Sequence, residues 1–182
     1  MELHLTIKRD YTVIEINVYY RKWYNIINKP KSFVKNIINI SLIDLNIYEY
    51  KPIISVVLAN NKLLQKLNYE YRKKDKPTNV LSFPYNKLNK NCYLGEIFIS
   101  LDILISESID LNIPLEHHTS HMLIHGLLHI LDYDHEEPLD QHIMESIEIK
   151  LLDKLGIKNP YVPRETYYSN KSSTKNHIII NS

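Results

Sequence analysis

Three histidines spaced four residues apart interrupt an otherwise apolar run, and this pattern constrains the fold more than any other part of the chain. His121, His125 and His129 all lie between residues 115 and 131. Residues four apart project from one face of an α-helix. Because the other faces are apolar, we expect a buried helix over 115–131 whose histidine face meets either a polar network or a metal ion.

Helix geometry limits which of these histidines can share one ion. His121 and His129 would be about 12 Å apart along an axis that rises about 1.5 Å per residue, whereas zinc–nitrogen bonds are about 2.1 Å long. Only two neighbours in the row can therefore bind together. A third ligand must come from outside the helix, where Asp132, Asp134 and His135 follow.

The spacing of His125, His129 and His135 is H-x3-H-x5-H. Metzincin metalloproteases bind zinc through this spacing and keep water in the fourth position. A set of hydrogen-bonded core histidines is the alternative, and three histidines at this spacing make it the weaker one. We predict one zinc ion per chain on these three side chains. His121 is left without a ligand role, so we expect it to support a ligand or pack the helix.

Proteases with this spacing carry a glutamate directly after the first histidine, as the base that activates the zinc-bound water. Gly126 occupies this position in the present chain. A metal-dependent peptidase would therefore lack its general base. Glycine would instead allow the close approach of a substrate or of a neighbouring backbone.

Hydrophobic periodicity predicts mostly strands in the first half and helices in the second. Strands are expected at 13–20, 52–59, 80–84 and 93–100, and helices at 31–45, 101–111, 115–131 and 139–155. A further helix should follow the capping residue Asn60, with an inner face formed by Leu63, Leu64, Leu67 and Tyr71. The polar stretch 72–79 predicts a loop, and Gly156 a helix C-cap.

This order predicts an α+β fold, with a small mixed sheet packed with about five helices and a zincin-like, metal-bearing central helix. The apolar run at 52–59 predicts a strand buried on both faces. We expect one catalytic domain over residues 1–163 and a disordered tail over 164–182. Short apolar runs exclude a membrane span, and Cys92 as the single cysteine suits the cytoplasm.

Charge is distributed unevenly along the chain. Residues 1–100 hold 16 Lys and Arg against 8 Asp and Glu, whereas residues 101–156 hold 2 against 12. A basic half suits a polyanionic partner, although ordinary solvated surfaces are the commoner cause of such counts. The charge pattern alone therefore does not identify a partner.

Three sequence blocks carry a resemblance to a known family. They are HMLIHGLLHILDYDH at 121–135, LNYEYRKKDKPTNVLSFP at 67–84 and LGEIFIS at 94–100. The blocks resemble the signature motifs of the YbeY family of bacterial rRNA maturation endoribonucleases, in the family's order and with similar gaps. The resemblance extends from about residue 13 to residue 161.

The resemblance implies a zinc-dependent hydrolase that cleaves single-stranded RNA, matures the 3′ end of 16S rRNA and takes part in ribosome quality control. It implies zinc on His125, His129 and His135, with His125 and Arg72 at the reaction centre. An arginine there can offer two hydrogen bonds to phosphate oxygens and stabilise charge in the transition state. We expect Lys73, Lys74 and Lys76 to contact the RNA backbone beside Arg72.

The expected partners are an rRNA precursor and the ribosomal subunit, with ribosomal proteins or a GTPase as further candidates and no membrane. Water and the ribose 2′-hydroxyl both remain candidate nucleophiles. Two other functions stay open: a metal-dependent peptidase, opposed by Gly126, and a non-catalytic ribosome assembly factor whose zinc is structural. Asp132 or Asp134 could supply the fourth ligand of such a closed site.

Two positions depart from the family pattern. Asp132 stands where the family has glycine, at the turn that ends the metal-bearing helix, and Glu96 replaces an aspartate. Aspartate tolerates a left-handed backbone at a cost of about 1 kcal/mol, so the turn can persist. Its carboxylate could also come close to the metal. Glu96 keeps the charge on a longer side chain.

Overall fold

The computed structural model describes residues 12–161 and contains one four-stranded mixed sheet. The strands are β1 (Val13–Val18), β2 (Ile53–Ala59), β3 (Val80–Pro84) and β4 (Tyr93–Ser100). Their order across the sheet is β1-β2-β4-β3. Strand β2 runs parallel to both of its neighbours, and β3 pairs antiparallel with β4 at the edge of the sheet.

Six α-helices and one 3-10 turn surround this sheet within the described part of the chain. They are α1 (Trp23–Ile26), α2 (Pro30–Asp44), η1 (Tyr48–Tyr50), α3 (Asn61–Arg72), α4 (Leu101–Asp110), α5 (Leu115–Ile130) and α6 (Pro138–Lys154). This confirms the predicted α+β class with a small mixed sheet. The sequence predicted about five helices, and the one-turn helix α1 is the one that it did not predict.

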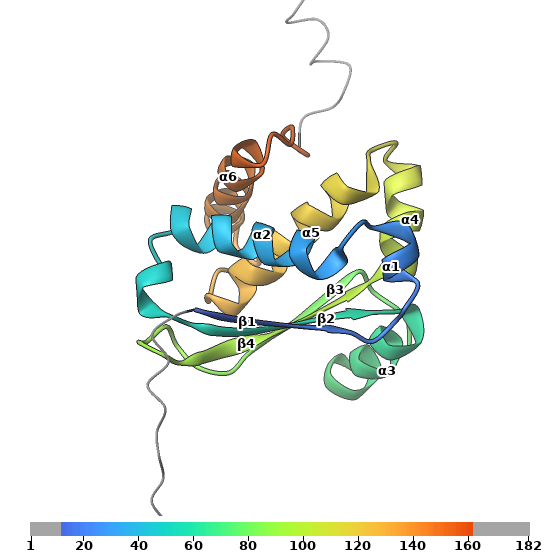
Figure 1. Ribbon diagram of the computed structural model, residues 1–182, viewed down its shortest axis with the longest axis horizontal. Coiled ribbons are helices and arrows are strands. Elements are labelled where there is room, and N and C mark those ends of the chain that lie inside the picture. Colours follow the sequence, from blue (N-terminus) through green and yellow to red (C-terminus); the bar gives the residue numbers. More distant parts are fainter. Residues whose placement is uncertain (1–11, 162–182) are drawn as a thin grey trace, which may run out of the picture.

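The helices are divided unequally between the two faces of the sheet (Figure 1). Helices α2, α5 and α6 lie over one face, where α5 contacts β3, β4 and α2, whereas α3 packs on the other face against β3 and β4. The larger core fills the space between the sheet and α2, α5 and α6. A smaller core lies beneath α3 and contains Val57, Ala59, Leu64 and Leu81.

Strand β2 is almost wholly apolar because it lies between the two cores. Ile54 and Val56 face the larger core, while Val57 and Ala59 face the smaller one. A strand with alternating side chains and a core on each face must be apolar throughout. The prediction of a strand buried on both faces is confirmed.

Helix α3 begins as the sequence predicts but differs at its other end. The side-chain oxygen of Asn60 accepts a hydrogen bond from the amide of Leu63 at 3.0 Å, which caps the helix. Tyr71, expected on the inner face, has 61% of its surface exposed. Arg72 is the last residue of the helix, so its assignment to a loop was wrong, because the helix ends only where Lys73 turns left-handed at φ 58°.

The remaining boundaries agree with the sequence to within a few residues. Gly156 has φ +71° directly after α6, as a C-cap requires. The expected disordered tail at 164–182 lies outside the described residues. Between Thr12 and Tyr161, no helix is both long and apolar enough to cross a membrane.

Candidate metal centre

Helix α5 carries two of the three candidate ligands, and one glycine sets its height above the sheet. A Cβ atom on Gly126 would lie 2.9 Å from Ile97 Cγ2 and 3.0 Å from Ser82 Oγ, closer than such atoms normally approach. The absence of a side chain therefore lets α5 sit directly on β3 and β4. The sequence offered two reasons for a glycine here, the close approach of a substrate or of a neighbouring part of the chain. The structure shows the second, because the neighbour is the sheet.

His125, His129 and His135 converge on one point. One ligand atom of each lies within 4.8 Å of the others. The Nε2 atoms of His125 and His129 are 3.1 Å apart, and two nitrogens bound to one tetrahedral metal at about 2.1 Å are separated by about 3.4 Å. This donor set fits a metal ion of the kind that imidazole binds. Of the candidate third ligands, His135 joins the pair.

Each helical ligand is oriented by a hydrogen bond from its other ring nitrogen. His125 Nδ1 donates to Glu148 Oε1 at 2.8 Å, and His129 Nδ1 donates to the carbonyl oxygen of Tyr133 at 3.1 Å. These bonds place the proton on Nδ1 and leave the Nε2 lone pair directed at the shared point. Burial, followed by the neighbouring histidines, lowers the pKa of His129 to about 4, so that this ligand is neutral near pH 7.

Glu148 on α6 organises the far side of the histidine row. Its side chain is 1% exposed and also accepts hydrogen bonds from His121 Nε2, at 2.9 Å, and from the hydroxyl of Tyr161. Burial acts to raise the pKa of Glu148, but the hydrogen bonds outweigh it and lower the pKa to about 2. His121 therefore contacts the carboxylate that supports His125, and it does not reach the three-histidine cluster.

The turn after α5 brings His135 back to the helix. Asp132 has φ 72°, a left-handed conformation that glycine adopts without strain. The amide of Tyr133 donates to the carbonyl of Leu128 at 3.0 Å, and Asp134 Oδ1 accepts from the amide of His135 at 2.7 Å. Among residues 12–161, neither Asp132 nor Asp134 joins the cluster of ligand atoms.

Comparison with known proteins places this chain in a family. A family model described as Endoribonuclease YbeY matches residues 17–156. The chain belongs to the YbeY family of endoribonucleases. A protein with the same description from Ehrlichia canis is 90% identical over 154 residues, 85% of this chain and 100% of that protein. A second relative with this description, from Anaplasma marginale, is 51% identical over 154 residues, with the same two coverages.

A solved structure supports the fold. A protein of Thermotoga maritima, determined in solution, aligns with a TM-score of 0.53 and 22% identity over 92% of this chain and 100% of that one. At this identity the likeness concerns the arrangement of helices and strands. The α+β architecture of this YbeY-family chain is therefore shared with a distant protein.

The basic residues proposed for the YbeY-family site lie at the end of α3 and in the loop that leads from it to β3. Arg72, Lys74 and Lys76 are exposed. Within the described residues, Arg72 has no hydrogen-bond or ion-pair partner. The structure thus brings the histidines together and leaves the cations on an exposed surface at the end of α3.

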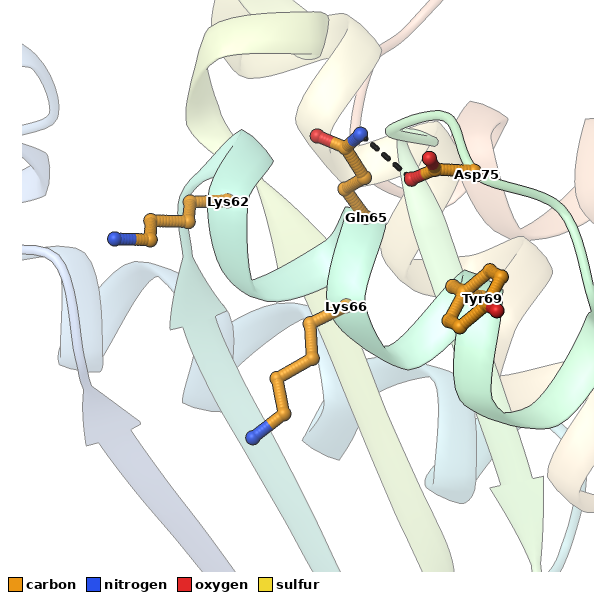
Figure 2. Close-up of a pocket in the computed structure, with 5 residues that line it drawn as sticks. All are labelled: Lys62, Gln65, Lys66, Tyr69 and Asp75. Atoms are coloured by element: carbon orange, nitrogen blue, oxygen red, sulfur yellow. Dashed lines mark hydrogen bonds between the residues drawn. The ribbon is translucent and has the colours of Figure 1, made fainter.

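That surface continues along the outer side of α3 (Figure 2). Lys62 and Lys66 extend from consecutive turns of the helix beside Tyr69. Gln65 Nε2 donates to Asp75 Oδ1 at 2.9 Å, which holds the loop after Arg72 against the helix. Asn68 Nδ2 donates to the carbonyl of Lys76 at 2.7 Å and has the same effect. The basic loop is therefore fixed in place by α3.

Sequence reasoning missed Glu148, although the chain carries a signal for it. Met144, Leu151 and Leu152 are buried on α6, and Glu148 lies on the same stripe at spacings of four, three and four residues. A carboxylate in the apolar stripe of a helix needs a buried partner. The neighbouring histidine row was the available partner.

Proposed function

We propose that this chain is a zinc-dependent endoribonuclease that cleaves single-stranded RNA in the maturation of ribosomal RNA. Membership of the YbeY family supports the nuclease activity. Three convergent histidines, with no fourth protein ligand among the described residues, support a metal with a free coordination position. Imidazole nitrogens oriented by a carboxylate and by a carbonyl oxygen favour zinc.

The single observation that carries the proposal is the open side of the histidine cluster. Structural zinc sites are closed by four protein ligands, whereas catalytic sites keep one position for water or substrate. Neither aspartate of the turn occupies that position, which argues against the assembly factor with purely structural zinc.

A zinc ion bound here would supply a Lewis acid for a phosphate oxygen or a bound water. His125 and its two partner histidines hold the ion, and Glu148 orients His125. We assign phosphate binding to Arg72, whose unpaired guanidinium is free to form two parallel hydrogen bonds. Lys73, Lys74 and Lys76 follow it on the same exposed segment and would contact the RNA backbone.

A peptidase is opposed by the position of residue 126. The Cα–Cβ direction there points at Ile97, Ser82 and Val80 of the sheet, so a glutamate would be directed into the core and away from the histidines. This fold therefore has no room for the metzincin base at its usual place in the sequence.

In the cell we expect the substrate to be an rRNA precursor, processed at the 3′ end of 16S rRNA on the ribosomal subunit. Ribosomal proteins or a GTPase are candidate partners, and the cytoplasm is the expected location. This chain is 90% identical to a relative in the YbeY family. The simplest proposal is therefore that it acts on the substrate class implied by the family, precursor rRNA.

The test is cleavage of an end-labelled single-stranded RNA by the purified, zinc-loaded chain, with casein as a parallel substrate. We expect RNA cleavage that stops when zinc is chelated and returns when zinc is restored, and intact casein. His125→Ala, purified in parallel, controls for contaminating ribonucleases. Equal cleavage by this variant would remove the support for a nuclease, and RNA binding without cleavage would favour the assembly factor.

A further inference from the structure

The sheet face that α3 leaves uncovered carries a group of aromatic rings outside the metal centre. Phe83 and Phe98 belong to the smaller core on this face, while Ser82 and Ile97 point toward α5. Phe83 pairs with Glu96 across β3 and β4, and Leu81 pairs with Phe98. Side chains two residues apart on a strand share a face, so Tyr85 follows Phe83 on the same side.

Two of the tyrosines on this face are exposed and yet held in place. Tyr71 is 61% exposed, and its ring centroid lies 4.8 Å from that of Phe83 in an edge-to-face contact. Phe83 in turn packs edge-to-face on Phe98 at 5.6 Å. A ring that is backed in this way presents its free surface with little conformational freedom left to lose on binding.

Tyr85 is anchored independently of Tyr71. It is 59% exposed, its ring centroid lies 5.5 Å from that of Tyr93, and its hydroxyl donates to Glu96 Oε2 at 3.3 Å. Glu96 is one of the two positions that depart from the family pattern, and its carboxylate is engaged by this tyrosine. We call Tyr71, Phe83, Tyr85 and Tyr93 the tyrosine face.

Cations border the tyrosine face at both ends. Arg72, Lys73 and Lys74 directly follow Tyr71, and Lys87 and Lys90 follow Tyr85 in the exposed loop between β3 and β4. The exposed acidic residues on this side of the sheet are Glu70 and Asp75, which lie among these cations, and Glu15 on the opposite edge strand β1; Asp75 is engaged by Gln65. The surface thus combines aromatic rings with positive charge along one edge.

We propose that the tyrosine face binds the bases of single-stranded RNA, with Tyr71 and Tyr85 as two stacking positions. The inference rests on the proposed function, because it assigns a second contact surface to the same substrate strand. Unpaired bases stack on exposed aromatic rings, while the flanking cations attract the phosphates. A double helix, whose bases are already stacked, cannot use this surface. The tyrosine face therefore gives a physical reason for selecting single strands.

The test compares two probes that carry the same backbone charge: a labelled uridine dodecamer and an abasic ribose-phosphate chain of the same length. Binding to the zinc-loaded chain is followed by fluorescence anisotropy over a time shorter than that of cleavage, and a gel confirms that the probes are intact when the signal is read. We expect Tyr71→Leu and Tyr85→Leu each to weaken uridine binding by about tenfold, the scale of one base stacked on a ring. Tyr71→Phe and Tyr85→Phe should bind within about twofold of wild type, because they keep the ring.

Matched controls separate stacking from folding. Leucine still covers Phe83, so Tyr71→Leu should keep its unfolding temperature; should it fail to fold, Tyr71→Met carries the same comparison. Tyr24→Leu removes a tyrosine of similar exposure, 52%, on α1 and should leave binding unchanged. Affinity for the abasic chain should be the same in all variants.

The inference is overturned if wild type binds the uridine and abasic probes equally, or if both leucine variants bind uridine like wild type. The latter is the result expected if a ribosomal protein occupies this face. The proposed function is tested separately. RNA binding that depends on the tyrosines, without zinc-dependent cleavage, would support the tyrosine face and contradict the nuclease activity. Zinc-dependent cleavage with RNA binding unchanged in both leucine variants would support the nuclease activity and contradict the role of the tyrosine face.

Discussion

Glu148 Oε1 lies 2.8 Å from His125 Nδ1, and this contact joins α6 to the candidate metal ligands. The same carboxylate binds His121 and Tyr161. One buried negative charge on α6 therefore contacts both α5 and the segment that follows α6. Positive charge from a metal on the far side of His125 would strengthen this bond. The arrangement explains why a histidine row on a buried helix needs an acidic residue in the apolar stripe of its neighbour.

We predict that Glu148→Gln weakens metal binding by about 10- to 100-fold, the usual range when the partner of a ligand histidine is altered. The amide keeps the volume but loses the charge that orients His125. Metal affinity would be measured by competition with a chromophoric chelator. Asp153→Asn, an exposed change on the same helix, is the control and should have no effect. Unchanged affinity in Glu148→Gln would show that the contact is incidental.

The ligand assignment predicts different metal contents for neighbouring histidine variants. His125→Ala, His129→Ala and His135→Ala should each lose the metal, because each removes one of three convergent nitrogens. His121→Ala should retain it, since this histidine contacts Glu148 and not the cluster. Elemental analysis of the purified proteins measures the content directly. A full complement of zinc in the three ligand variants would contradict the site.

How much of the site the sequence could predict depended on distance along the chain. His125, His129 and His135 fall within eleven residues, and helical periodicity brought two of them together before any tertiary contact was known. Glu148 lies 23 residues from His125 and on another helix. Its role follows from the packing of α6 on α5, which no local pattern specifies.

The fold shows the same limit. The apolar run of β2 predicted a strand buried on both faces, and Asn60 predicted the start of α3, because both signals are local. The order β1-β2-β4-β3 depends on which strands pair after long connections, and no residue pattern encoded it. The end of α3 was misplaced because Arg72 is polar enough for a loop, while its exposed position on the helix tolerates the same residue.

Gly126→Glu would place the metzincin residue in this chain, and we predict that it destabilises the fold by several kcal/mol. Its Cβ would overlap Ile97 and its charge would be buried without a partner. Urea unfolding of the metal-free protein measures the loss, and Gly126→Ala should lose less because it buries no charge. Native-like stability together with casein cleavage would refute both the packing argument and the case against a peptidase.

Asp132→Gly should stabilise the fold by up to about 1 kcal/mol, since glycine adopts the left-handed conformation at φ 72° without strain. Asp132→Ala is the matched control: it removes the carboxylate but keeps the strain, so it should not gain stability. Urea unfolding and zinc affinity would be measured for both. A loss of stability or of zinc binding in both variants would mean that the carboxylate makes a contact that matters.

The last prediction separates catalysis from structure through Arg72. Its guanidinium has no partner among the described residues, so Arg72→Ala should retain fold and zinc content. If this cation stabilises charge on the phosphate, RNA cleavage should fall by about 10² to 10³, the usual scale for one positioned transition-state donor. Arg72→Lys should recover only part of the rate, because an ammonium cannot form the two parallel hydrogen bonds.

Lys35→Ala, which removes an exposed cation on α2, controls for a general loss of positive charge and should cleave at the wild-type rate. Single-turnover cleavage and RNA affinity are measured separately for each variant. A loss of affinity with an unchanged single-turnover rate would assign Arg72 to RNA binding alone, together with Lys73, Lys74 and Lys76. Wild-type rates and affinity in Arg72→Ala would remove this residue from the site, leaving the histidine cluster to act with other cations.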